Sequence, residues 1–140
     1  MKYIYLTTIL LILTRVSFSQ TRQLENGTYQ VNINSESYES YDLRVKDSLF
    51  IEYYKNETYI GKIKWINRNT FELVYDKESE NKFGELVKKL HESFGYYCYE
   101  IYPSGNNRYR LKITYSIHSE IIVNTGEMVK KEIEKIKLPR

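Results

Sequence analysis

The chain has 140 residues, of which 28% are charged, and a formal net charge of +3. This balance excludes a typical nucleic-acid-binding domain, which carries clustered Lys and Arg on one strongly basic face. The length allows one domain with a real core and no second domain, and the single cysteine, Cys98, excludes an internal disulfide.

Residues 1–19 have the pattern of an export signal peptide. Lys2 gives a positive start, residues 4–13 form an apolar segment, and Ser17 and Ser19 supply the small side chains of a cleavage site. A segment this short does not span a bilayer as a helix, which needs about 20 apolar residues. Retention as a membrane anchor is the alternative, and Arg15 argues against it. We expect an exported protein, periplasmic or secreted, with no transmembrane segment after signal removal.

Apolar residues then recur at alternate positions, as in half-buried strands. In the first half of the domain all of these positions are odd-numbered, and they form successive groups: Tyr29, Val31, Ile33; Tyr41, Leu43, Val45; Leu49, Ile51, Tyr53; Tyr59, Gly61, Ile63, Trp65; Phe71, Leu73, Tyr75. In an antiparallel hairpin, opposed residues share a face, so this common parity predicts one continuous apolar face.

The segment YIGKIKWINRNTFEL, residues 59–73, predicts the register of one hairpin. A three-residue loop at 67–69 pairs Trp65 with Phe71 and sets Lys64 opposite Glu72 on the other face. A shift of one residue would mix charged and apolar side chains on both faces.

The same reasoning gives three-residue loops at 46–48 and 55–57. They pair Val45 with Leu49, and Tyr53 with Tyr59. They also bring Asp42 beside Glu52, a like-charged pair that needs solvent or a bulge.

The period changes to that of a helix over residues 79–94. Ser79 is the expected N-cap and Gly95 the expected end. The apolar face consists of Phe83, Leu86, Val87, Leu90 and Phe94.

Alternation returns after the helix, with Tyr97, Tyr99 and Ile101 before a turn and Tyr109, Leu111 and Ile113 after it. A loop centred on Gly105 pairs Ile101 with Tyr109, Tyr99 with Leu111, and Glu100 with Arg110. Ile117, Ile121 and Val123 continue the odd parity into a last strand, and residues 131–140 form a charged C-terminal tail.

These elements predict a mainly β domain over residues 20–130. An antiparallel meander of about eight strands would close into a lipocalin-like barrel or a curled half-barrel, with one inserted helix, because closure buries one apolar face and removes free edges. A two-sheet sandwich is the alternative.

Tyrosine is unusually frequent, with fifteen copies, and many of them fall on the inward parity. The inward aromatic positions are Tyr41, Tyr53, Tyr59, Trp65, Tyr75, Tyr99 and Tyr115. An eight-stranded barrel is either filled by such rings or holds one small ligand. If it holds one, Trp65, Tyr53, Tyr59, Tyr75 and Tyr99 line the site, Gly61 leaves a slot and the helix covers one mouth.

Outward aromatics form a second candidate surface. Tyr54, Tyr96 and Tyr102, with Phe50, have the opposite parity and would stack on a partner protein or a surface glycan. Tyr102 would otherwise cover the stem of Arg108.

Signals for catalysis are weak. His91 and His118 lack the spacing of zinc ligands, so no metal site or cofactor is expected. Cys98 and His118 could act as a nucleophile and base only with a third orienting group, which the sequence does not supply. No catalytic residue is assigned, and Cys98 is expected to be a small buried side chain.

The segments FSQ, NGTY, DSLFIEYY, GKIKWINRNTFEL and NTGEMVKK resemble those of a loose group of small exported bacterial proteins with a lipocalin-like or half-barrel fold. The resemblance implies export and the fold class, and it supplies no activity and no site residue. The preferred interpretation is a non-enzymatic exported barrel that binds a small apolar or aromatic molecule or has a structural role in the envelope. The alternative is a module that binds a partner protein or glycan, and a hydrolase comes third.

Overall fold

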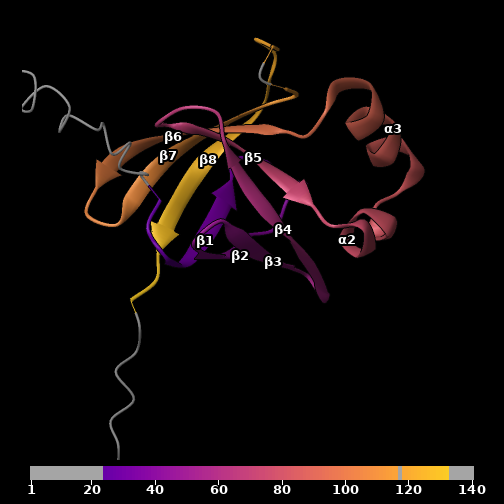
Figure 1. The fold of residues 1–140 in the computed structure, drawn as a ribbon. Coiled ribbons are helices and arrows are strands. Elements are labelled where there is room, and N and C mark those ends of the chain that lie inside the picture. Colours follow the sequence, from indigo (N-terminus) through magenta and orange to yellow (C-terminus); the bar gives the residue numbers. More distant parts are fainter. Residues whose placement is uncertain (1–23, 117, 133–140) are drawn as a thin grey trace, which may run out of the picture.

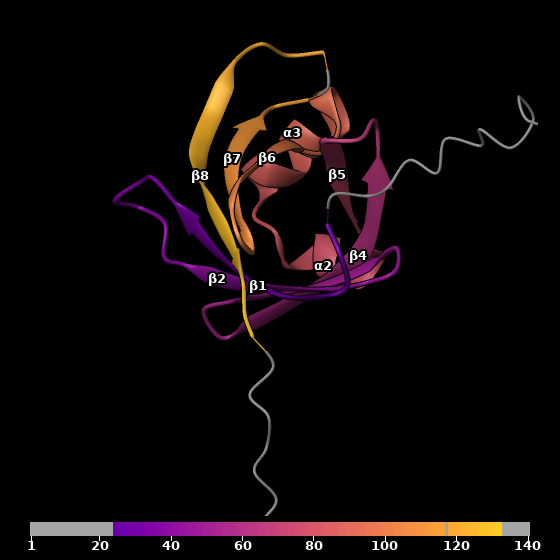
Figure 2. The same cartoon turned by 90° about the vertical axis from the view of Figure 1, so that its left-hand side faces the viewer.

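Eight antiparallel strands close into one barrel in the computed structural model, which describes residues 24–116 and 118–132 (Figure 1). Each strand pairs with the next along the chain, and β8 pairs back with β1. Figure 2 shows the strands arranged around a common centre. The strands are β1 (Gly27–Ile33), β2 (Tyr41–Lys46), β3 (Leu49–Tyr54), β4 (Glu57–Trp65), β5 (Thr70–Tyr75), β6 (Cys98–Gly105), β7 (Arg108–Thr114) and β8 (Ile122–Lys130).

The closed meander confirms the predicted fold class. It also excludes the sandwich, in which two separate sheets would face each other. The expected signal peptide, residues 1–19, lies outside the described residues, as do Ile117 and residues 133–140 of the expected tail.

The β4–β5 hairpin has the predicted register. Trp65 is opposite Phe71, Ile63 is opposite Leu73, and Lys64 is opposite Glu72. The ammonium of Lys64 lies 3.1 Å from the Glu72 carboxylate on the outer face. Here the sequence pattern was decisive because only one register separates charged from apolar side chains.

The register of β3 differs from the prediction by one residue at both ends. The turns contain two residues each, so Val45 pairs with Phe50 instead of Leu49, and Tyr59 pairs with Glu52 instead of Tyr53. Asp47 and Lys55 adopt left-handed backbone conformations, with φ of 57° and 54°, which make such tight turns possible.

The shift exchanges the inward and outward faces of β3 relative to the prediction. Phe50 is fully buried, whereas Leu49 and Tyr53 are 52% and 42% exposed. Asp42 therefore lies opposite Tyr53, and the expected Asp42–Glu52 pair does not form. Because the second short turn reverses the effect of the first, β4 returns to the predicted parity.

The β6–β7 hairpin is offset by two residues from the prediction. Ile101 pairs with Leu111 and Tyr99 with Ile113, and a register shift lies between Pro103 and Gly105. An offset of two residues leaves every side chain on its predicted face. Glu100 accordingly forms its outer ion pair with Lys112, not with Arg110.

The last strand begins later than predicted, and from Asn124 onward its inward residues are even-numbered instead of odd-numbered. β8 starts at Ile122, and both Ile121 and Ile122 are exposed. A register shift between Ile113 and Thr114 brings the even-numbered Met128 into the core, where it is 1% exposed.

Two short helices, α2 (Lys77–Lys82) and α3 (Glu85–Phe94), lie between β5 and β6, where one helix over 79–94 was predicted. Asp76 is the N-cap of α2, and its carboxylate accepts a hydrogen bond from the backbone N–H of Ser79 at 2.7 Å. The Ser79 hydroxyl accepts from the N–H of Ile60 at 2.7 Å, so it attaches α2 to β4 instead of capping a helix. Gly95 ends α3, as predicted.

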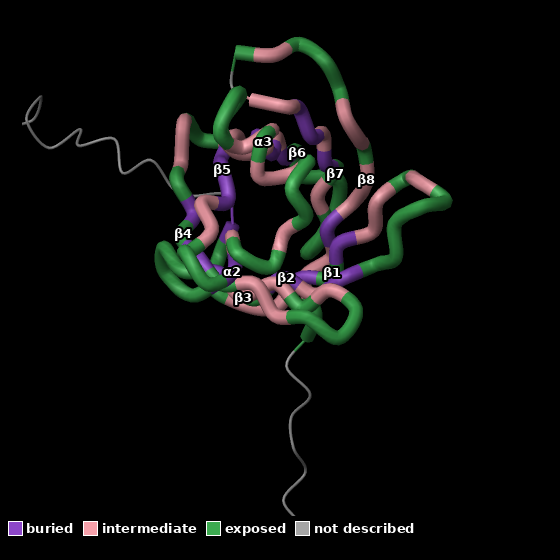
Figure 3. The backbone as a smooth tube through the Cα atoms, turned by 90° about the vertical axis from the view of Figure 1, so that its right-hand side faces the viewer, coloured by how far each residue is buried: buried purple, intermediate pink, exposed green. Residues whose placement is uncertain are grey.

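Large side chains fill the barrel interior, and buried stretches follow the strands in Figure 3, whereas α3 has none. The largest fully buried residues are Tyr29, Phe50, Phe71, Leu43, Leu73, Ile101, Met128 and Val31. Gly61 does not leave the expected slot, because the Phe50 ring occupies the space beside it. A Cβ atom at Gly61 would lie 2.7 Å from that ring and 2.2 Å from the carbonyl oxygen of Val74.

We therefore expect Gly61→Ala to lower the free energy of unfolding by about 2 kcal/mol or more, since overpacking of a core costs roughly 1–3 kcal/mol. Gly105→Ala is the control, because nothing lies within 4 Å of the added Cβ atom. It should change stability by no more than about 0.5 kcal/mol. Urea denaturation followed by circular dichroism measures both, and equal effects would contradict the packing.

Candidate functional site

A cavity of about 280 Å³ opens at one mouth of the barrel. The C-terminal ends of β1, β3, β5 and β7 meet the N-terminal ends of β2, β4, β6 and β8 at this mouth, and each of these strands contributes to its wall. The chain between β5 and β6, which holds α2 and α3, also leaves the barrel here. Val87 of α3 and Phe83 between the helices complete the wall.

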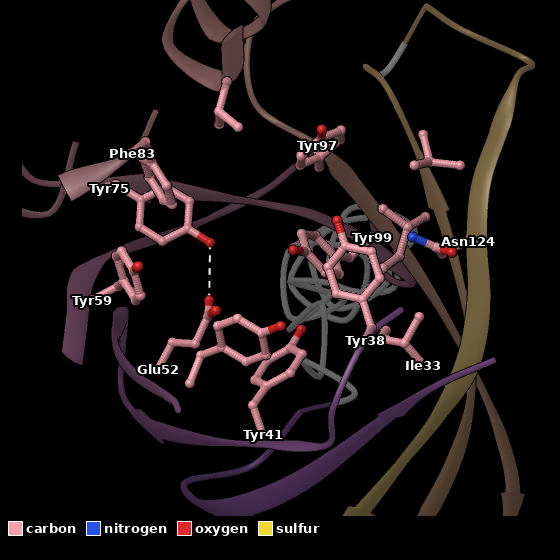
Figure 4. Close-up of a pocket in the computed structure, with 14 residues that line it drawn as sticks. Ile33, Tyr38, Tyr41, Glu52, Tyr59, Tyr75, Phe83, Tyr97, Tyr99 and Asn124 are labelled. Carbon is pink, nitrogen blue, oxygen red and sulfur yellow. Dashed lines mark hydrogen bonds between the residues drawn. The ribbon is translucent and has the colours of Figure 1, made fainter. Parts of the chain in front are cut away.

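Aromatic rings dominate the lining, and seven of its fourteen residues are tyrosines. The remaining residues are one phenylalanine, four aliphatic side chains, one carboxylate and one amide. The tyrosines are Tyr38, Tyr41, Tyr54, Tyr59, Tyr75, Tyr97 and Tyr99; the others are Phe83, Ile33, Val87, Ile113, Val123, Glu52 and Asn124. In the view of Figure 4, Glu52 and Asn124 lie on opposite sides of the space.

The structure places three of the five predicted ligand-contacting residues, Tyr59, Tyr75 and Tyr99, around this cavity. Tyr53 is not among them because the register of β3 turns it outward. Tyr115 also lies outside the lining and contacts Tyr97 at 6.0 Å between ring centroids.

Trp65 packs in the interior without lining the cavity. Its ring lies 5.0 Å from that of Phe71, which in turn stacks on Tyr99 at 5.4 Å with nearly parallel planes. The rings of Phe71 and Tyr99 thus lie between Trp65 and the cavity, and Tyr99 is the one that lines it. Trp65 therefore packs behind the floor of the cavity and is not one of its lining residues.

Among the lining residues that sequence reasoning did not place in the site, which include Tyr38, Tyr54 and Asn124, Glu52 is the one with a carboxylate. Its carboxylate projects into the cavity and accepts a hydrogen bond from the Tyr75 hydroxyl at 2.9 Å (Figure 4). Burial raises the pKa of Glu52 to about 7, although the Tyr75 hydrogen bond acts in the opposite direction. The turn chemistry of Asp47 and Lys55 was the only sequence signal that could have placed Glu52 inside.

The neighbouring phenols remain protonated donors at neutral pH. Burial is the main cause that raises the pKa values of Tyr41, Tyr75 and Tyr99 well above their ordinary value, and the charge of Glu52 contributes to each. Tyr41 and Tyr99 also interact through a side-chain hydrogen bond. The site therefore presents hydroxyl groups, one amide and one titratable carboxylate on an otherwise apolar surface.

The helical segment forms part of the wall of the site and packs against the barrel through aromatic rings. The Phe83 ring stacks on Tyr59 at 5.0 Å and meets the edge of Tyr75 at 4.8 Å. His91 stacks on the outer side of this cluster, 6.2 Å from Tyr75, and its Nδ1 atom lies 2.7 Å from the Glu80 carboxylate. This contact joins α3 to α2.

The three aromatics predicted to form an outer recognition surface do not lie together. Tyr54 faces the cavity, and Tyr96 packs between His91 and Tyr75. Tyr102 is exposed, and its hydroxyl donates to the carboxylate of Glu100. Phe50, which shares their parity, is fully buried.

Cys98 is buried, as the sequence predicted, and its pKa is raised, chiefly by burial. A raised pKa disfavours the thiolate that a nucleophile requires. His118 lies on an exposed loop. Within residues 24–116 and 118–132, no three His, Cys, Asp or Glu side chains form a group that could hold a metal ion.

No protein-family model matches the sequence, and neither a curated protein nor a solved structure is significantly similar to it. In the described part of the chain, no helix has the length and hydropathy to cross a bilayer.

The pKa of Glu52 predicts a pH-dependent stability. It is about 7 in the folded protein against an ordinary 4.5, so the protonated carboxyl favours folding. This contribution is complete below pH 4.5 and is lost as the pH rises through 7. Glu52→Gln keeps the acceptor for Tyr75 without the charge, and it should therefore raise the free energy of unfolding at pH 8 by roughly 1–3 kcal/mol and have little effect at pH 4.5.

Urea denaturation at both pH values measures this difference. Glu92→Gln, which removes an exposed carboxylate of α3, is the matched control and should show no comparable gain at the higher pH. A Glu52→Gln effect that is the same at both pH values would contradict burial of the charge.

Proposed function

We propose that the protein is an exported, non-enzymatic binding protein whose barrel holds one compact small molecule with apolar or aromatic character. The observation that carries this proposal is the cavity itself, which is open at one mouth, receives side chains from all eight strands and is walled by aromatic rings from β2 to β6 and from the helical segment. Ligand sites are typically concave, mostly apolar and supplied with a few polar groups that orient the ligand. Glu52, Asn124 and the phenol hydroxyls are such groups.

The volume limits the size of the ligand. At about 280 Å³ the cavity falls just below the range of roughly 300–1,000 Å³ that drug-sized molecules occupy. A molecule with a single ring or a short branched body fits this space, whereas a long acyl chain would have to extend into solvent. Export is supported by the sequence pattern of residues 1–19, and the resemblance to small exported bacterial barrels agrees with it.

A recognition surface on the outside of the barrel has less support. Such a surface required Tyr54, Tyr96 and Tyr102 to form one exposed strip. Tyr54 instead lies in the cavity wall, and Tyr96 packs against His91 of α3. A structural role alone would not require an open cavity lined with polar groups.

Filling the cavity from its helical wall tests the proposal. Val87→Trp places an indole in the space, whereas Leu86→Trp adds the same bulk to a neighbouring side chain that is 72% exposed. We expect Val87→Trp to weaken binding at least tenfold, a loss of about 1.4 kcal/mol or more, and Leu86→Trp to leave it unchanged.

The measurement is isothermal titration calorimetry with compounds selected by a thermal-shift screen of aromatic amines, aromatic acids, neutral phenols and short fatty acids. Trp65 fluorescence is less direct, because Phe71 and Tyr99 lie between the indole and the cavity. A screen in which no compound binds, or binding that Val87→Trp leaves intact, would refute the proposal.

A further inference from the structure

We propose that the ligand of this cavity carries a positive charge, as an ammonium group attached to a compact apolar body, and that Glu52 and the surrounding tyrosine rings recognise this group. The inference rests on the proposed function and specifies its ligand class. Glu52 is the only acidic residue among the fourteen residues that line the space, and none of the fourteen is a Lys, Arg or His.

The carboxylate lacks an ionic partner within the described residues. Tyr75 donates one hydrogen bond to it, and Lys82, whose ammonium lies near the Tyr59 ring of the wall, is engaged elsewhere. Lys82 donates to the carbonyl oxygen of Thr58 at 2.8 Å and lies 3.9 Å from the Glu57 carboxylate. A carboxylate enclosed by protein is costly unless it is paired, and a ligand cation would supply the missing partner.

The rings around Glu52 suit a cation for a second, independent reason. The face of an aromatic ring is negative, so that rings arranged around an ammonium group attract it. Two rings of this wall already have lysine ammonium groups nearby: Lys55 lies 5.3 Å from the Tyr54 centroid and Lys82 lies 5.9 Å from the Tyr59 centroid. Neither lysine is part of the lining, so the interior of the cavity remains available to a ligand cation.

An anionic ligand fits the site poorly. Its charge would meet the Glu52 carboxylate without a compensating Lys, Arg or His in the lining. A neutral ligand could accept hydrogen bonds from the phenols, but it would leave the carboxylate unpaired. The amide of Asn124, across the space, can accept from a second donor of an amine ligand or orient a hydroxyl group.

The ionised form of Glu52 is the one that would bind a cation, so affinity should increase with pH. Tyr75 donates a hydrogen bond to Glu52. The charge of Glu52 also contributes to the raised pKa values of three further tyrosines, Tyr41, Tyr59 and Tyr99. From the helices, His91 and Glu80 form their own pair in the layer behind Tyr75. Because the pKa of Glu52 is about 7, binding near pH 6 should release protons into the buffer.

Two matched pairs of probes isolate the charge: 2-phenylethylamine with 2-phenylethanol, and choline with 3,3-dimethylbutan-1-ol. Each pair has nearly the same shape and differs in the positive charge. Calorimetry with the whole domain at pH 8 should show at least one amine binding tenfold or more tightly than its neutral counterpart, a difference of about 1.4 kcal/mol. The anion 3-phenylpropanoate should bind more weakly than either aromatic probe.

Glu52→Gln should reduce the affinity for the amine at least tenfold and change that for the neutral alcohol little, whereas Glu52→Asp, which keeps the charge, should retain the preference for the amine. Val87→Trp should weaken both members of a pair. Proton release at pH 6, measured by repeating the titration in buffers of different ionisation enthalpy, should disappear in Glu52→Gln.

Equal affinities for an amine and its neutral counterpart would overturn the inference and leave the proposed binding function standing. The same conclusion follows if Glu52→Gln binds the amine as tightly as the unaltered protein does. Absence of binding by both amines also overturns it, whereas the proposed function fails if the wider screen of compounds gives no ligand or if Val87→Trp leaves binding intact.

Discussion

The contact between the Phe50 ring and Gly61 determines which face of β3 lies inside the barrel, and the character of the site depends on it. Phe50 is fully buried, and Gly61, directly opposite on β4, has no side chain to displace the ring. With Phe50 inside, the alternation of the strand carries Glu52 and Tyr54 inward as well. The turn before β3 agrees with this register, since Asn26 accepts a hydrogen bond from the backbone N–H of Asp47 at 2.6 Å.

The two ends of the barrel differ in packing: one is filled by side chains and the other holds the cavity. At the mouth without helices, the Tyr29 hydroxyl donates to the carbonyl of Glu25, and Leu24 is buried against the core. At the other mouth, the rings stand apart and leave the cavity. Tyr99 links the two regions because it lines the cavity and stacks on Phe71, one of the most buried side chains. A ligand would thus rest on a floor that is held by the packed part of the core.

Alternation in the sequence was sufficient to predict the register of a hairpin wherever only one register separates polar from apolar side chains. The β4–β5 hairpin meets this condition, because Lys64 and Glu72 must stay outside while Ile63 and Leu73 go inside. The segment LFIEYY does not, since it is apolar or aromatic on both faces and turn geometry decides its orientation. The prediction therefore identified Tyr59, Tyr75 and Tyr99 on well-patterned strands, assigned Tyr53 to the wrong face and left Glu52 outside.

The sequence predicted a helical segment between β5 and β6 but not its division into two helices, for a related reason. The spacing of apolar residues over 79–94 continues through Phe83, whose side chain is required by the aromatic cluster of the barrel mouth. Phe83 and Gly84 adopt an extended backbone there, which divides the segment into two helices. A tertiary contact overrides the local pattern, and periodicity alone carries no information about such a contact.

Glu52 is the residue for which packing offers no explanation. A glutamine would accept the same hydrogen bond from Tyr75 without placing a charge among buried rings, and a leucine would fill the wall of a purely structural barrel. Burial of the carboxylate lowers stability at neutral pH, because its pKa is raised to about 7. Residues that lower stability in this way are characteristic of functional sites, where the cost is balanced by an interaction absent from the free protein. In this cavity, which the strands and helices leave open, the carboxylate is positioned so that a bound cation could balance it.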